Sequence, residues 1–295
     1  GIVSYKHAAE AAGLGRIGWD FHCKQLSKHK DFELIAVADT VEQRRQEAEA
    51  TFHCRAFADL DEIIDEAGLD AVVIATPTHL HRQMAERALK AGLHVYLEKP
   101  MAATAADARA IARAATRARR VISIYQPHRA AAYFQHLLRL IGTGKIGRVY
   151  HIRRGMFSYV RRNDWQSQVK FGGGMLNNYG AHALDQVLKL TGHPVARAFC
   201  ELRRVATLGD ADDVVKIVYE TAGGVLGEVD INMGAAITSY EFEVYGTTGA
   251  ICLQKGVFTM RWFSPSRLKA RKLDVSLASA NRQVLIQATV LEVNL

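Results

Sequence analysis

A glycine pattern near the start of the chain has the spacing of a dinucleotide site. Gly13, Gly15 and Gly18 fit G-x-G-x-x-G, with Arg16 and Ile17 inside the motif. In such a motif the first glycine permits a tight turn and the second lets the backbone approach a pyrophosphate, while the third allows close packing of a helix on a strand. The helix after the motif would direct its N-terminus at the phosphates.

An acidic residue downstream extends this pattern. Asp39 follows Gly18 by about 20 residues and ends the next predicted strand. A carboxylate in that place can hold the ribose hydroxyls of adenosine and repels a 2′-phosphate, which favours NAD over NADP. Arg44 and Arg45 are close enough in the sequence to keep NADP possible.

A lysine followed by a proline ends a third predicted strand. Lys99 and Pro100 come directly after Glu98 and the apolar run at residues 94–97. The carboxyl ends of parallel strands face the crevice in which such sheets bind ligands, so Lys99 could exchange a proton with a substrate hydroxyl. The proline permits a cis peptide bond. By itself, an exposed lysine at a strand end is usually only solvated.

The first 125 residues contain elements that would position these groups. Short apolar runs alternate with helical patterns, as in βαβ units that build a parallel sheet. Strands are predicted at residues 32–39, 71–76, 94–97 and 121–125, and helices at residues 40–52, 81–91 and 105–120. Thr40 is a candidate cap for the first of these helices, and Gly92 is a candidate end for the second.

The strand required before Gly13 has an unusual composition. Residues 7–12 read HAAEAA, without a β-branched side chain and with Glu10 in the interior. A buried, unpaired carboxylate there would cost several kcal/mol. The βαβ pattern that follows still favours a strand.

Beyond residue 125 the pattern is typical of an α+β domain. Helices are predicted at residues 130–141 and 180–190, and strands at residues 149–157, 196–205, 214–219, 225–232, 240–245, 250–253 and 257–263. Gly223 and Gly224 predict a hairpin between two of the strands. Residues 282–295 fit a strand or a helix.

These patterns predict two domains. Residues 1–125 should form an α/β Rossmann domain with a doubly wound parallel sheet that binds the dinucleotide. Residues 126–295 should form an α+β domain with a large, mostly antiparallel open sheet.

Composition excludes several classes of protein. Hydrophobic residues make up 49% and charged residues 23%, as in ordinary soluble proteins, and no apolar run approaches the ~18–20 residues that cross a bilayer. Residues 1–6 lack the build of a signal peptide. The net charge of +8 suits an anionic cofactor, whereas the arginines within residues 109–120 lack interleaved aromatic side chains. We expect a cytoplasmic protein without nucleic-acid or membrane partners.

Cysteine and histidine spacing gives no indication of a metal. Cys23, Cys54, Cys200 and Cys252 form no CxxC pair, which suits reduced thiols. The histidines show no ligand spacing, and the pair at residues 79 and 81 lacks a third partner. No metal site is expected.

Four segments in a fixed order carry a family resemblance. They are GLGRIG at residues 13–18, ATPTHLH at 75–81, EKP at 98–100 and GGGMLNNYGAHALDQ at 172–186. Together with GKIG at residues 144–147, they resemble the Gfo/Idh/MocA family across nearly the whole chain. The resemblance implies an NAD-dependent dehydrogenase that acts on a secondary alcohol of a sugar, inositol or related polyol, and that assembles as a homodimer or homotetramer.

The same resemblance implies contacts with the cofactor. Thr76, Pro77, His79 and His81 would line the loop near the nicotinamide half. Glu98 would contact the nicotinamide ribose. Gln126 and Arg129 match the segment that closes over the carboxamide.

It also implies a catalytic and substrate-binding group. Lys99 would be the catalytic lysine and His182 its acid/base partner. Asp185, one helical turn after His182, could accept a hydrogen bond from a substrate hydroxyl. Tyr159 and Trp165 could stack against a sugar ring, although Trp165 suits a protein core equally well.

The sequence departs from the family pattern at two positions. Asn178 stands where many members carry aspartate, four residues before His182. An amide forms hydrogen bonds but does not ionise, so proton transfer falls to His182 or Lys99. Thr78 replaces a usual asparagine, and the chain looks short at its C-terminal end.

Two other functions stay open. Some relatives hold NAD tightly and hydrolyse glycosides by oxidation and elimination. Others bind a dinucleotide without catalysis and act as sensors, a reading that Asn178 favours faintly and the intact EKP and His182 oppose. The substrate and its stereochemistry depend on loop geometry that the sequence does not reveal.

Overall fold

The computed structural model describes residues 7–64, 68–268, 275 and 286–294; for residues 7–11 and 294 it describes the backbone alone. The chain divides into two compact units. The first comprises Gly1–Gln126 and Gln168–Gly173, and the second comprises Pro127–Ser167 and Gly174–Leu295.

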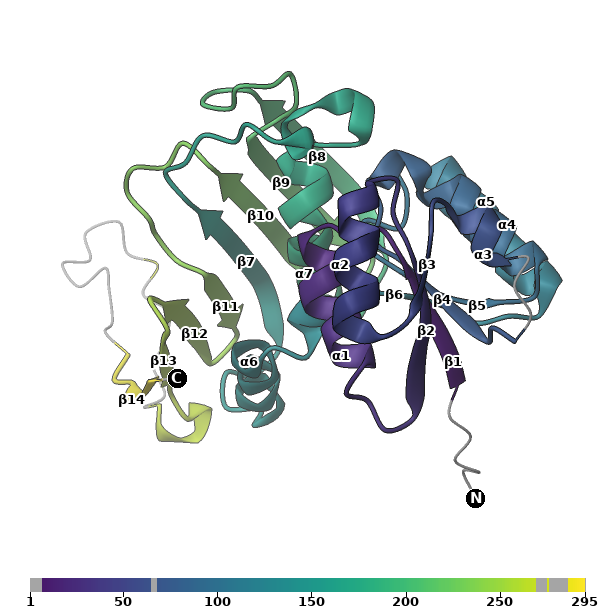
Figure 1. The fold of residues 1–295 in the computed structure, drawn as a ribbon. Helices are drawn as coiled ribbons and strands as arrows, with labels where there is room; N and C mark the ends of the chain where they lie inside the picture. The colour runs from purple at the N-terminus through teal and green to yellow at the C-terminus, as the bar shows by residue number, and fades with distance from the viewer. Residues whose placement is uncertain (1–6, 65–67, 269–274, 276–285, 295) are drawn as a thin grey trace. The chain divides into compact units, whose positions relative to one another are not determined.

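The first unit is built on a six-stranded parallel sheet in the order β3-β2-β1-β4-β5-β6 (Figure 1). Its strands are β1 His7–Ala12, β2 Phe32–Ala38, β3 Arg55–Phe57, β4 Ala71–Ile74, β5 His94–Leu97 and β6 Ile122–Ile124. The strand order reverses direction between β1 and β4, and ligands bind at such switch points in open α/β sheets.

Helices connect these strands. They are the π-helical turn η1 Gly18–Cys23, α1 Lys24–Leu26, α2 Glu42–Phe52, α3 Leu60–Ile64, the 3₁₀ turn η2 Thr78–Leu80, α4 His81–Lys90 and α5 Ala105–Ala118, with the 3₁₀ turn η5 Val169–Phe171 in the later segment of the unit. Apolar side chains of α4 and α5 pack against β4 and β5, which places one core on this face of the sheet.

Most sequence predictions for this unit are confirmed, including β1. Its backbone pairs with β2 and β4, so the two flanking strands stabilise it despite its composition. The side chain of Glu10 lies outside the described residues. The predicted cap at Thr40 is wrong: α2 has Val41 at its N-cap, and the Val41 N–H donates to Asp39 Oδ1 at 2.9 Å. Gly92 lies just past α4 with a φ of +87°, as expected.

The second unit contains an eight-stranded sheet in the order β14-β13-β12-β11-β7-β10-β9-β8 (Figure 1). Its strands are β7 Val149–Phe157, β8 Val195–Arg203, β9 Val214–Thr221, β10 Leu226–Asn232, β11 Phe242–Gly246, β12 Gly249–Gln254, β13 Val257–Trp262 and β14 Thr289–Asn294. Every pair is antiparallel except β7 with β10, so the prediction of a mostly antiparallel sheet is confirmed. At the C-terminal end, where the sequence allowed strand or helix, residues 289–294 form a strand on β13; residues 282–285 and 295 lie outside the described residues.

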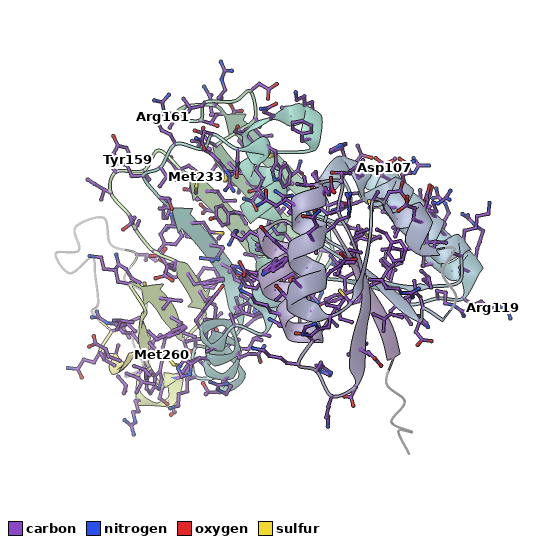
Figure 2. All side chains as sticks on the ribbon, viewed as in Figure 1. Asp107, Arg119, Tyr159, Arg161, Met233 and Met260 are labelled. Carbon is purple, nitrogen blue, oxygen red and sulfur yellow. The ribbon has the colours of Figure 1, made fainter. Side chains whose placement is uncertain are left out.

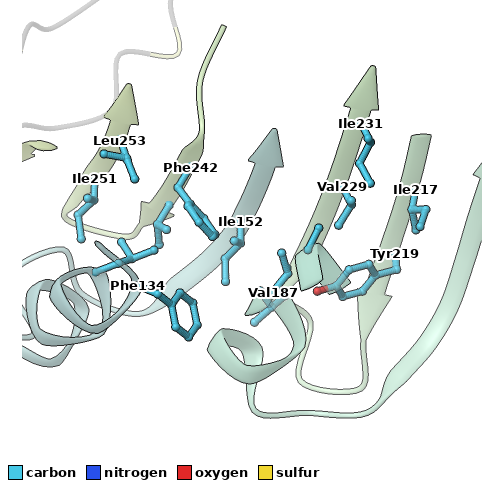
Figure 3. Close-up of a cluster of buried hydrophobic side chains, with 14 of the residues drawn as sticks. Phe134, Ile152, Val187, Ile217, Tyr219, Val229, Ile231, Phe242, Ile251 and Leu253 are labelled. Atoms are coloured by element: carbon cyan, nitrogen blue, oxygen red, sulfur yellow. The ribbon is translucent and has the colours of Figure 1, made fainter. Parts of the chain in front are cut away.

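Two longer helices, α6 Ala132–Gly142 and α7 Ala181–Thr191, contribute to a core with this sheet. Buried side chains from both helices meet alternate side chains of the strands, as Figure 3 shows for Phe134, Ile152, Val187, Val229 and Phe242. The shorter helical turns are η3 Pro127–Arg129, η4 Trp165–Ser167, η6 Leu176–Gly180 and η7 Pro265–Arg267. The π-helical turn η6 leads directly into α7, which carries His182.

Candidate active site

The glycine turn follows β1, and two of its positions have no room for a side chain. Gly13 has a φ of +96°, and a Cβ there would lie 2.8 Å from the Ala75 carbonyl oxygen. A Cβ on Gly18 would collide with the Gly13 carbonyl group. Beside Gly15, in contrast, the space is open. The turn is therefore tight beneath Gly13 and Gly18 and leaves room for a ligand at Gly15.

Asp39, buried at the end of β2, holds this turn in place. Its Oδ2 accepts from the Leu14 N–H at 2.7 Å, while its Oδ1 accepts from Val41. Arg44 Nη1 lies 3.5 Å from Oδ2, and Arg45 Nη1 donates to the Asp39 carbonyl oxygen at 2.8 Å. Each carboxylate oxygen has a second lone pair, so the group can still accept a ribose hydroxyl.

Glu98, after β5, is buried beside His22, a residue to which the sequence analysis gave no role in the site. Its Oε1 lies 2.9 Å from His22 Nε2, and its Oε2 accepts from the Lys99 N–H at 3.2 Å. The His22 ring meets the rings of Tyr96 and Tyr125 edge to face. His22 lies in η1, far from Glu98 in the sequence, so no local spacing could have indicated the pair.

His81 joins two loops at the same edge of the sheet. Its Nδ1 lies 2.9 Å from the Pro100 carbonyl oxygen and its Nε2 lies 2.9 Å from that of Thr76. Burial lowers the pKa of His81. Both ring nitrogens are thus engaged with backbone groups, and the ring connects the end of β4 to the cis Lys99–Pro100 peptide.

The remaining predicted cofactor residues of the first unit follow the same strand ends. Thr76 donates from Oγ1 to Met84 Sδ at 3.3 Å. The His79 ring packs against Phe171, with ring centroids 5.4 Å apart. Arg16 and Ile17 begin the helix after β1, Pro77 follows β4, and Gln126 follows β6. The carboxyl edge of the parallel sheet therefore carries the predicted cofactor residues of the first unit, whereas Arg129 belongs to the second unit.

In the second unit, His182 on α7 lies against another histidine. Its side chain is only 5% exposed, and its ring stacks on His128 with centroids 4.0 Å apart and planes 15° apart. His128 Nδ1 lies 3.1 Å from Tyr133 Oη. Gln186 Nε2 donates to the His128 carbonyl oxygen at 3.1 Å and to Tyr133 Oη at 2.9 Å. These hydrogen bonds hold the segment that carries His128, and the His182 ring packs against the His128 ring.

Asp185 and Arg129 form a two-pronged ion pair. Arg129 donates from Nε to Oδ2 at 2.7 Å and from Nη2 to Oδ1 at 2.5 Å. These bonds to Asp185 raise the pKa of Arg129. From the sequence, Arg129 was expected near the cofactor carboxamide and Asp185 near a substrate hydroxyl, whereas the structure pairs them with each other. A substrate hydroxyl would therefore have to bind the carboxylate lone pairs of Asp185 that Arg129 does not use.

Asn178 lies in η6, Trp165 begins η4 and Tyr159 follows β7, all in the second unit. Asn178 donates from Nδ2 to Gln166 Oε1 at 3.1 Å. Trp165 is 37% exposed, so it is not part of the core. Tyr159 is 75% exposed and lines a cavity of about 290 Å³ with Arg161, Met233 and three further residues (Figure 2).

The described part of the chain contains neither a metal-binding cluster nor a membrane-spanning helix. Among residues 7–64, 68–268, 275 and 286–294, no group of three or more His, Cys, Asp or Glu side chains could hold a metal ion. Within the same residues, every helix is too short or too polar to cross a membrane.

The parallel sheet, its glycine turn and the acid after β2 define an NAD-binding Rossmann fold. A family model for an oxidoreductase family with an NAD-binding Rossmann fold, GFO_IDH_MocA, matches residues 11–126, and a model for the GFO/IDH/MocA C-terminal domain matches residues 134–252. The chain therefore belongs to the GFO/IDH/MocA family of NAD-binding oxidoreductases. The fold and family predicted from the sequence are confirmed.

Similar proteins include dehydrogenases. The inositol 2-dehydrogenase of Rhizobium meliloti is 29% identical over 251 residues, which cover 82% of this chain and 74% of that protein. The myo-inositol 2-dehydrogenase of Thermotoga maritima is 27% identical over 81% of this chain and 72% of its own length. The crystal structure of the WlbA dehydrogenase from Bordetella pertussis in complex with NADH and UDP-GlcNAcA is 26% identical and has a TM-score of 0.77, covering 85% of this chain and 75% of that one.

Proposed function

We propose that this protein moves a hydride between NAD and a secondary alcohol carbon of a sugar, inositol or related polyol. The observation that carries the proposal concerns the two candidate proton carriers, Lys99 and His182. Lys99 follows β5 at the carboxyl edge of the first unit's sheet, and the ring of His182, on α7 of the second unit, stacks on His128. The names of the two inositol dehydrogenases support the same substrate class.

Within the proposal, the first unit binds and orients the cofactor. The N–H groups of the turn at Gly13, Gly15 and Gly18 face the pyrophosphate, and Asp39 holds the adenosine ribose. Glu98, steadied by His22, accepts from the nicotinamide ribose. When NAD is bound, its nicotinamide supplies the hydride chemistry. The preference for NAD over NADP rests on Asp39.

The proton is assigned to the chain's own side chains. A hydride leaves the alcohol carbon only as the hydroxyl loses its proton, so a base must lie within ~3 Å of that oxygen. Asn178 cannot serve, because an amide does not ionise. Lys99 and His182 therefore carry the proton, while Asn178 and Asp185 hold substrate hydroxyls and Tyr159 and Trp165 contact the ring.

We further propose that residues 1–125 act as the cofactor domain and residues 126–295 as the domain for substrate and subunit contacts. The sheet face opposite α6 and α7 carries half-buried ion pairs, with Arg153 Nη1 at 2.5 Å from Glu243 Oε2 and Lys216 Nζ at 2.9 Å from Glu228 Oε2. Such a face suits contact between two copies of the chain. Light scattering that finds only monomers would contradict this assembly. The cytoplasmic location expected from the sequence stays a prediction.

The direct test is to incubate the purified protein with NAD and a panel of sugars and inositols while following absorbance of reduced cofactor. We expect NADH to form with at least one secondary alcohol. Release of free sugar from a glycoside without net NADH would instead indicate the glycosidase reaction. Cofactor binding without turnover across the panel would indicate a sensor.

A further inference from the structure

A chain of hydrogen bonds in the second unit begins at a buried arginine and ends at the histidine that stacks on His182. Arg154, on β7, is 5% exposed, and its Nε donates to Gln186 Oε1, on α7, at 3.2 Å. Its guanidinium lies 4.4 Å from the centroid of the Phe242 ring and donates to two backbone carbonyl oxygens. Burial lowers the pKa of Arg154, but the guanidinium stays protonated at neutral pH. The chain therefore begins at a fixed positive charge.

This charge sets the orientation of the Gln186 amide. A guanidinium has donors only, so the atom of Gln186 that faces it must be the amide oxygen. The amide nitrogen then lies on the other side, where it donates to the His128 carbonyl oxygen at 3.1 Å and to Tyr133 Oη at 2.9 Å. Gln186 is 0% exposed, and turning the amide over would place its N–H groups against the guanidinium. Only one orientation of the amide satisfies all of its neighbours.

The Tyr133 hydroxyl extends the chain to His128. Its oxygen accepts from Gln186, and it lies close enough to the guanidinium to oppose the effect of burial on the pKa of Arg154. Because donors occupy the oxygen, the hydroxyl proton is directed at its remaining neighbour, His128 Nδ1, at 3.1 Å. A ring nitrogen that accepts a hydrogen bond carries no proton, so the proton of the neutral ring is on Nε2.

We propose that this chain holds His128 as the neutral tautomer with its proton on Nε2. Arg154, Gln186 and Tyr133 are then positioning residues. They present an uncharged ring to His182, with centroids 4.0 Å apart and planes 15° apart.

The charge state of His128 has a consequence for the proton that His182 carries, and this consequence rests on the proposed function. Two parallel imidazolium rings so close together would repel each other. The buried guanidinium at the far end of the chain also disfavours a positive charge on His128. A neutral His128 therefore leaves His182 as the ring of the pair that takes up the proton of the substrate hydroxyl.

The test is NMR spectroscopy of the full chain with ¹⁵N-labelled histidine, at neutral pH and without cofactor or substrate. The ¹⁵N shifts of the ring nitrogens distinguish the two neutral tautomers from imidazolium, and the signals lost in His128→Phe are those of His128. We expect a neutral ring with its proton on Nε2. A proton on Nδ1, a mixture of tautomers or a charged ring would overturn the proposal.

Gln186→Glu should reverse the chain with little change in shape. Both oxygens of a carboxylate accept, so one still faces Arg154 and the other takes the proton of Tyr133. The Tyr133 oxygen then becomes an acceptor, and Nδ1 of His128 should gain a proton. Gln254→Glu, the same change at an exposed glutamine of the second unit, should leave the His128 signals unchanged. A folded Gln186→Glu variant with an unprotonated Nδ1 on His128 would contradict the proposal.

If Gln186→Glu does not fold, Tyr133→Phe decides. It keeps the ring beside Phe242 and removes the hydroxyl, so the Nδ1 signal of His128 should move to the position of a nitrogen that accepts no hydrogen bond. An Nδ1 signal that stays in place would show that Tyr133 is not its donor, which overturns the proposal.

Turnover tests the consequence for His182 separately. With an alcohol that the protein oxidises, Tyr133→Phe should lower kcat by ~3–10-fold at unchanged KM, because His128 is no longer held in one form. An unchanged kcat would overturn the consequence for His182. Absence of turnover with every alcohol would refute the proposed function, whereas the tautomer of His128 is decided by the spectra alone.

Discussion

The two units position their candidate chemical groups by different means. In the first unit, the backbone does most of the work: Gly13 makes the turn, and Asp39 accepts two backbone N–H groups. In the second unit, side chains hold one another, as in the stack of His128 on His182 and the Arg129–Asp185 pair. Substitutions at the backbone-held turn of the first unit should therefore weaken cofactor binding, and folding as well where the turn is tight, whereas substitutions in the side-chain contacts of the second unit should lower turnover.

The largest effect should come from the glycine turn. Gly13→Ala forces a Cβ against the Ala75 carbonyl oxygen at a positive φ and should lower the free energy of unfolding by about 2 kcal/mol or more, with loss of NAD binding. Gly15→Ala is the matched control, because its Cβ meets open space. That variant should keep its Tm and bind NAD ~10-fold more weakly, since the methyl group occupies room for the pyrophosphate. Thermal unfolding and NAD titration measure both; equal loss of stability in the two variants would contradict the difference.

Removing the proposed proton carriers should affect turnover alone. Lys99→Met keeps the length of the side chain and removes its amine, so kcat should fall by ~10²-fold or more while NAD binding persists. His182→Ala should act similarly, and the double variant should be far from additive. Full turnover by Lys99→Met would rule out the proposed role.

The histidine stack should have a smaller effect. His128→Leu removes the ring that lies against His182 and should lower kcat by ~10-fold with little change in NAD affinity. His128→Phe retains an aromatic ring and should recover part of the loss. Steady-state kinetics that show only a change in KM, or no recovery with phenylalanine, would mean that the stack does not position His182.

The preference for NAD over NADP tests the role of Asp39, which accepts two backbone N–H groups in the first unit. The protein should bind NAD more tightly than NADP, and Asp39→Ala should narrow that gap by ~10-fold. The same change removes the acceptor for Leu14 and Val41, so Tm should also fall. Fluorescence titration of both cofactors provides the measurement. Equal affinities in the unmodified protein would exclude NAD preference.

The smallest effect is expected at Asn178. Asn178→Asp restores the residue that many family members carry and should leave kcat/KM within ~10-fold, because the proposed proton carriers are already present. A much larger gain would show that the amide limits the reaction. A much larger loss would show that its donation to Gln166 is essential.

The sequence could predict those site residues whose positions are set by nearby residues in the chain. The glycine motif, Asp39 and Lys99 each stand at a strand end, so their positions follow once the βαβ pattern is recognised. The short elements β3 and α3 were missed because a few residues hold too little periodicity.

Partners far apart in the sequence could not be predicted. Contacts between His22 and Glu98, or between His128 and His182, depend on side chains that only the folded chain brings together. The sequence analysis named both Arg129 and Asp185 but did not predict their ion pair, because no spacing rule links two residues 56 positions apart.

The short segment Gln168–Gly173 has a consequence for synthesis of the protein. It belongs to the first unit although β7 precedes it in the chain, and it packs on the loop after β4 through Thr78 and His79. A ribosome that has released only the first 126 residues has therefore not released all of that unit. The nascent chain must extend through residue 173 before the first unit can reach its final form, and by then β7 has already emerged.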